Sequence, residues 1–171
     1  MIPLADAGDT TVRSLHLIGA AVWAGGMVML ALAVGAARRT VAETERVALF
    51  RALGRRFAIA GGIAMVVLIA TGIRMAADRL GSWSDLTDTA YGERLADKLV
   101  LVAVVIALTL FHSLVQGPAL SRLRAQALEE PDDAELAALI RRKAARSGIV
   151  SGLNLLATLA ILVLAARLVS G

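Results

Sequence analysis

The chain has 171 residues, 58% of them hydrophobic, and its mean hydropathy of +0.73 is above that of water-soluble domains. The net charge is +4 but only 4% of the residues are aromatic, so no basic surface with interleaved stacking rings indicates a nucleic-acid partner. The absence of cysteine excludes disulfides, iron–sulfur clusters, c-type haem attachment and thiolate metal sites.

Four apolar runs organise the sequence, at residues 12–37, 58–77, 95–117 and 147–169. Each reaches the roughly 20 residues that a membrane-spanning helix requires. We therefore predict an all-α, single-domain integral membrane protein over residues 1–171, folded as an up-down-up-down four-helix bundle in the lipid bilayer. The first run is too long for a signal peptide, so we expect it to be retained.

The first run carries a polar stripe, because its imidazole, indole and small residues recur at spacings of three and four. These residues are His16, Gly19, Trp23, Gly26 and Leu30. An imidazole inside a membrane is costly unless it faces protein, a ligand or water. The glycines suit close packing between helices, and such small-residue faces also suit a second copy or another membrane protein as partner.

Basic residues concentrate in the two segments that join the first to the second run and the third to the fourth. These segments hold 12 of the 18 lysine and arginine residues: Arg38, Arg39, Arg46, Arg51, Arg55, Arg56, Arg122, Arg124, Arg141, Arg142, Lys143 and Arg146. Basic loops stay cytoplasmic, so we predict an inner (plasma) membrane location with both termini outside. Residues 38–57 alternate apolar and charged positions as an amphipathic helix lying on the membrane surface does.

The second half of the chain is predicted as two spans with helical extensions. Residues 78–92 form an external loop, and Gly117-Pro118 is predicted to end the third helix. A polar helix follows over 121–128, then a turn at 129–133 that caps a helix leading into the fourth span.

Polar residues also recur on one face of the third and fourth runs. Lys98, Val105 and His112 are seven residues apart, and the fourth run presents Ser147, Ser151, Asn154 and Thr158 at spacings of three and four. Three of the four spans thus turn polar groups toward a common interior.

The two histidines are candidate metal ligands. In an up-down bundle His16 lies near the outer face and His112 near the inner face, about 15–20 Å apart in depth, so they suit two sites better than one. Met75 is expected near the outer site and Met29 near the inner one. Imidazole with thioether suits copper(I), although methionine also fills packing gaps.

Haem b is the alternative ligand. Imidazole and thioether are also axial haem ligands, and cations near the outer face, Lys98, Arg74 and Arg13, suit its propionates. The same cations suit lipid headgroups. There is no phosphate loop, nucleophile elbow or HExxH pair, so we find no catalytic residues and expect a non-enzyme.

The segment LHLIGAAVWAGGM at the first run resembles the opening helix of the copper-resistance D (CopD) membrane family. Thr89-Ala90-Tyr91-Gly92 followed by Lys98-Leu99 resembles the Tyr-Gly…Lys-Leu segment of that family. The resemblance implies a role in copper movement or tolerance, with His16, Trp23, Tyr91 and Lys98 as family-like positions.

The chain is also similar to HemJ, a membrane protoporphyrinogen oxidase, in its His and Trp in the first run and its Lys98…His112 third run. It departs from that family in the fourth run, GIVSGLNLLATLAIL, which lacks an Asn-Glu-x-Pro lead. Copper handling is therefore the leading interpretation. A haem or porphyrin protein and a ligand-free structural subunit are the alternatives.

Overall fold

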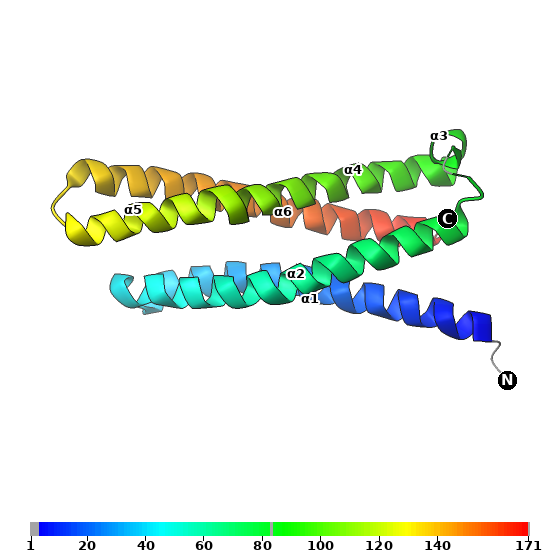
Figure 1. Cartoon of the computed structure of the whole chain (residues 1–171), viewed down its shortest axis with the longest axis horizontal. Helices are drawn as coiled ribbons and strands as arrows, with labels where there is room; N and C mark the ends of the chain where they lie inside the picture. The colour runs from blue at the N-terminus through cyan, green and yellow to red at the C-terminus, as the bar shows by residue number, and fades with distance from the viewer. Residues whose placement is uncertain (1–3, 83, 171) are drawn as a thin grey trace. The chain divides into compact units, whose positions relative to one another are not determined.

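The computed structural model describes residues 4–82 and 84–170, and every regular element in this part of the chain is helical. The elements are α1 (Leu4–Thr40), α2 (Glu43–Arg79), α3 (Asp85–Asp88), α4 (Ala90–Phe111), η1 (His112–Gln116), α5 (Gly117–Glu129) and α6 (Ala134–Ser170) (Figure 1). They fall into two compact units, Met1–Gly92 and Glu93–Gly171, which are described separately.

Four helical stretches are long and apolar enough to cross a membrane, as the sequence predicted: Gly8–Thr40, Glu45–Arg79, Ala90–Glu129 and Ala134–Ala166. At most 17% of the residues in the most apolar window of any of them are buried within the chain. Their surfaces carry exposed large side chains such as Leu17, Ile63 and Leu156. In water such surfaces would be unfavourable, whereas in a bilayer they contact lipid.

The first unit is an antiparallel hairpin of α1 and α2, joined by residues 41–42 (Figure 1). The expected separate surface helix at 38–57 is not present as such, because residues 43–57 continue into the second span within the single helix α2. At about 1.5 Å per residue, the 37 residues of α2 are far longer than the roughly 30 Å hydrocarbon core. The charged first third of α2 therefore extends beyond the apolar layer as unbroken helix.

Small residues let α1 and α2 approach closely. The ring centroids of Trp23 and Phe57 are 5.7 Å apart, and Trp23 is buried. A Cβ atom on Gly26 would overlap the Phe57 ring, and one on Gly61 would lie 3.3 Å from both the Phe57 and the Trp23 rings. One on Gly19 would come within 3.1 Å of a Leu68 side-chain carbon. These glycines therefore have the packing role expected of small residues in membrane helices.

A short segment with the single helical turn α3 connects α2 to α4. Gly92 is buried, and a Cβ atom there would lie 2.7 Å from the backbone carbonyl carbon of Asp85. Next to it, the Tyr91 hydroxyl accepts a hydrogen bond from Arg79 at 3.4 Å, and the Arg79 guanidinium lies 5.8 Å from the Tyr91 ring centroid. The Tyr-Gly pair therefore has a structural basis: the glycine permits close backbone approach and the tyrosine anchors an arginine.

In the second unit α4, η1 and α5 form one helical path that runs antiparallel to α6 (Figure 1). The predicted helix end at Gly117-Pro118 is therefore wrong. The Gly117 N–H bonds to the His112 carbonyl, five residues back, which makes a π-helical turn immediately before the proline. This wider turn accommodates the proline, which has no N–H and whose ring clashes with a regular preceding turn.

The turn before α6 is confirmed. Asp133 Oδ1 accepts hydrogen bonds from the N–H groups of Glu135 at 2.8 Å and Leu136 at 2.9 Å. A carboxylate in this position satisfies two of the otherwise unpaired N–H groups at a helix start. Residues 134–146 then run directly into the fourth span, as predicted.

Candidate functional site

His16 of α1 is held by Thr71 of α2. Its Nδ1 lies 2.8 Å from Thr71 Oγ1, and a Cβ atom on Gly72 would be 3.5 Å from its Cε1. The antiparallel packing of the hairpin brings these residues together although 55 positions separate His16 from Thr71 in the sequence. The pair is half-buried, which reduces the competition from water for this bond.

The hydrogen bonds of Thr71 determine which ring nitrogen of His16 carries the proton. Thr71 Oγ1 donates its single hydrogen to the Val67 carbonyl at 2.6 Å. The hydroxyl oxygen therefore accepts from His16, so Nδ1 bears the hydrogen and Nε2 carries the lone pair. This is the tautomer in which Nε2 coordinates a metal or accepts a hydrogen bond.

His112 is arranged in a similar way in the second unit. It begins the π-helical turn, and its Nδ1 lies 3.3 Å from Gln116 Oε1 and 3.4 Å from Ser147 Oγ. An amide oxygen only accepts, so Nδ1 again carries the hydrogen and Nε2 the lone pair. Within the described part of the chain, Nε2 of His112 has no hydrogen-bond partner. Single π-helical turns are frequent at functional sites in other proteins.

Part of the polar stripe of α6 contacts α4, whereas the prediction that the whole stripe faces the bundle interior is wrong for Ser151, which is exposed. The Asn154 Nδ2 donates to Thr109 Oγ1 at 3.0 Å, and the Thr109 hydroxyl donates to the Val105 carbonyl at 2.7 Å. Asn154 is 8% exposed, and its Oδ1 is buried without a hydrogen-bond partner among the described residues. Ser147, Asn154 and Thr158 are all buried, whereas Ser151 is exposed.

The two methionines predicted as ligands differ in their surroundings. Met75 is one turn beyond Thr71 on α2, on the same face of the helix, and lines a cavity between α1 and α2. Met29 is 65% exposed. Thirteen residues of α1 place it about 20 Å along the helix from His16, which keeps it away from the first site, and its expected place beside His112 stays a prediction.

The predicted cationic and aromatic residues have distinct contacts. Arg74 Nε forms an ion pair with Asp78 Oδ2 at 3.1 Å, and its side chain is 65% exposed. Lys98 lies half-buried near the start of α4. Trp23 is part of the hairpin packing against Phe57. Each of these contacts belongs to one unit, so the expectation that they surround one porphyrin stays a prediction.

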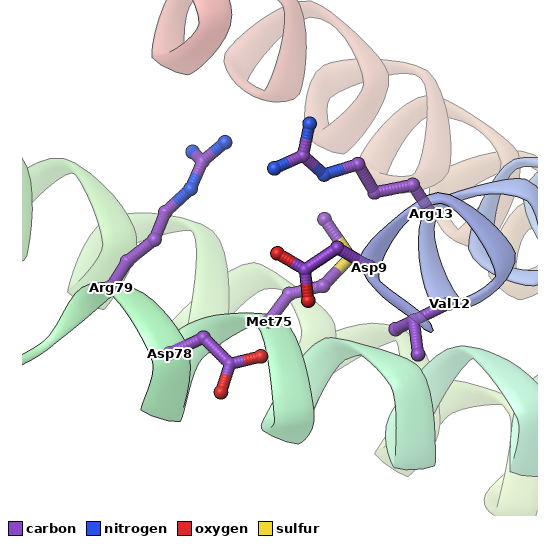
Figure 2. A pocket seen from close by; sticks show the side chains of 6 residues that line it. All are labelled: Asp9, Val12, Arg13, Met75, Asp78 and Arg79. Atoms are coloured by element: carbon purple, nitrogen blue, oxygen red, sulfur yellow. The ribbon is translucent and has the colours of Figure 1, made fainter. Parts of the chain in front are cut away.

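The cavity at the end of the α1–α2 hairpin has a volume of about 120 Å³. Figure 2 shows its lining residues, which are Asp9, Val12, Arg13, Met75, Asp78 and Arg79. Two carboxylates and two guanidinium groups therefore surround one hollow where the start of α1 meets the end of α2, and sequence spacing alone did not bring them together.

The described residues contain no cluster of three or more histidine, aspartate or glutamate side chains that could enclose a metal ion. His16 and His112 therefore each offer one imidazole and are not part of such a cluster. A single imidazole suits a soft ion that accepts few ligands, such as copper(I). It suits a hard ion less well, because hard ions need several oxygen ligands.

Sequence reasoning missed the groups that orient the two imidazoles. Thr71 is a lone hydroxyl in an apolar run, and pairing it with His16 requires the register of the hairpin. The Gln116 contact needs only the i,i+4 spacing from His112, so the helical pattern contained a signal for it.

Comparison with known proteins gives one family match. A family model described as copper resistance protein D (CopD) matches residues 51–168, about two thirds of the chain. The match includes Lys98 and His112 and leaves His16 and Trp23 outside. No curated protein and no solved structure shows a significant match.

Proposed function

Because this chain belongs to the CopD family, whose members are copper-resistance-type membrane proteins, we propose that it binds copper in the membrane and moves it across. His16 and His112 are the nitrogen ligands in this proposal, and the thioether of Met75 is a further soft donor beside the first. Copper is here the cargo. The proposal places the protein in the inner membrane with both termini outside, because basic segments stay cytoplasmic.

The single observation that carries the proposal is the matching arrangement of the two histidines. Each Nδ1 donates to a side-chain oxygen, which places the lone pair on Nε2. Partners of this kind orient metal-binding histidines in many proteins and raise their basicity as ligands.

The first test is copper(I) binding to protein in lipid nanodiscs, measured by competition with a chromophoric copper(I) chelator. We expect His16→Ala and His112→Ala each to remove part of the bound copper and the double variant to remove nearly all of it. A double variant that binds copper like the wild type would refute the proposal.

Thr71→Val tests the orienting bond separately, since valine keeps the shape of threonine and removes the acceptor. We expect copper affinity at the first site to fall by about tenfold, as loss of such a partner typically causes. Thr109→Val is the matched control: it removes an equivalent hydroxyl from α4, where it bonds to Val105 and Asn154 rather than to a histidine. Equal effects of the two substitutions would show that the Thr71 effect is not specific.

An optical spectrum of the same sample separates copper from the alternatives. A Soret band that is lost in His16→Ala or His112→Ala would identify haem and overturn the copper proposal. Protein with no copper, no absorbance and normal helicity would identify the ligand-free structural subunit instead.

A further inference from the structure

The cavity at the end of the α1–α2 hairpin has a charge pattern that copper binding does not use. Its lining combines the carboxylates of Asp9 and Asp78 with the guanidinium groups of Arg13 and Arg79. Figure 2 shows the two guanidinium groups extending toward each other along one edge, with both carboxylates away from that edge. The charges sum to zero but are separated in space.

The polar groups of the cavity are only partly satisfied by the protein. In the described part of the chain, Asp9 and Arg13 have no hydrogen-bond or ion-pair partner, although they lie four residues apart on one helix. Arg79 is anchored by Tyr91, and Asp78 pairs with Arg74 outside the cavity. Two guanidinium groups turned toward each other repel unless an anion lies between them.

A ligand that fits must carry both charges. A simple cation would be repelled by Arg13 and Arg79, and a simple anion would be repelled by Asp9 and Asp78. In each case this repulsion offsets the attraction to the other pair of side chains. A zwitterion with a phosphate and a primary ammonium group satisfies all four side chains: the arginines donate to the phosphate and the carboxylates accept from the ammonium.

The level of the cavity in the membrane identifies the source of such a group. Arg13 is the last charged residue before the apolar run of α1, and Arg74 is the first after the apolar run of α2. This boundary is where lipid headgroups lie. We propose that the cavity binds the headgroup of phosphatidylethanolamine, a lipid that carries both required groups.

The test is the composition of lipid that co-purifies with the protein. The protein is equilibrated in nanodiscs of equal phosphatidylethanolamine and phosphatidylglycerol, extracted in mild detergent, and its retained lipid is quantified by mass spectrometry. We expect about fivefold enrichment of phosphatidylethanolamine, the fold-change produced by two partly exposed ion pairs. In a mixture with phosphatidylcholine we expect the same preference, because a trimethylammonium group cannot donate to carboxylates.

Paired variants separate the two halves of the site. Asp9→Asn with Asp78→Asn should abolish the enrichment but keep phospholipid bound, and Arg13→Gln with Arg79→Gln should lower retained phospholipid of both kinds. Arg39→Gln is the matched control, since it removes an exposed arginine of α1 that neither lines the cavity nor pairs with Asp9 or Asp78, and it should leave the enrichment unchanged.

Helicity and gel-filtration behaviour of each variant establish that it is folded. Retained lipid that matches the bulk mixture in the wild type, or an enrichment that survives both paired variants, would overturn the proposal. Copper that displaces the lipid, and whose binding is lost in the double variant Asp9→Asn, Asp78→Asn, would also overturn the proposal. The cavity would then be a cation site. Met75 lines the cavity and is also the proposed thioether ligand of copper, so the lipid composition is measured without copper and its outcome does not depend on copper binding at the histidines.

Discussion

Replacement of Gly26 by alanine is expected to destabilise the α1–α2 hairpin, while the same change at the adjacent Gly25 is not. A Cβ atom on Gly26 would overlap one Phe57 ring carbon and lie 2.9 Å from the next. The ring cannot move away easily, since it also packs against Trp23 and over Gly61. A Cβ atom on Gly25 would meet nothing within 4 Å.

The magnitude follows from two opposing terms. Overpacking of this kind costs about 1–3 kcal/mol, and alanine regains about 0.5–1 kcal/mol of helix propensity over glycine. We therefore expect Gly26→Ala to lower the free energy of unfolding by about 1–2 kcal/mol and Gly25→Ala to leave it equal or higher. For a chain of this size each kcal/mol corresponds to about 2–4 °C in Tm.

The assay is thermal unfolding in detergent, followed by loss of the monodisperse gel-filtration peak. Phe57→Leu in the Gly26→Ala background should restore part of the loss, because the shorter side chain vacates the space that the new methyl group enters. A double-mutant cycle with Phe57→Leu alone isolates this coupling. Equal stabilities of Gly25→Ala and Gly26→Ala would refute the close approach of the two helices at this point.

Three further substitutions test other parts of the fold. Asp133→Ala should lower stability by about 1 kcal/mol and speed amide exchange in the first turn of α6, whereas Asp132→Ala, which caps nothing, should not. Asn154→Leu alone should lower the free energy of unfolding by about 1 kcal/mol, measured by thermal unfolding. Addition of Thr109→Val should reduce this loss, because the Thr109 hydroxyl is then no longer left without its Asn154 partner. Gly92→Ala should lower Tm by more than Gly25→Ala changes it, because its methyl group would meet the backbone of α3 rather than open space.

Much of the architecture was predictable from local pattern alone. The four apolar runs identified the spanning helices because a helix that crosses the bilayer needs about 20 apolar residues. This requirement holds whatever the neighbouring helices are. The cap at Asp133 was predictable for a similar reason, since a carboxylate one residue before a helix satisfies nearby N–H groups without any distant contact.

Helix continuity was harder to predict than helix identity. Gly117-Pro118 is a typical helix end, yet the π-helical turn at His112 lets the helix continue. The charged residues 43–57 suggested a separate surface helix but extend α2 instead. Both differences arise because the continuation of a helix depends on how the backbone accommodates one residue and on the path of the helix it packs against. The hydropathy of the sequence reports neither.

By itself the sequence determined that the chain crosses the membrane, that no thiolate site exists, and that two imidazoles sit on otherwise apolar helices. Only the tertiary structure decided what each imidazole bonds to and which charges share a cavity. The Thr71 bond to His16 joins residues 55 positions apart, and the cavity joins Asp9 to Arg79 across two helices. Such pairings depend on the register between helices, which the close approach at Gly19 and Gly26 sets through packing.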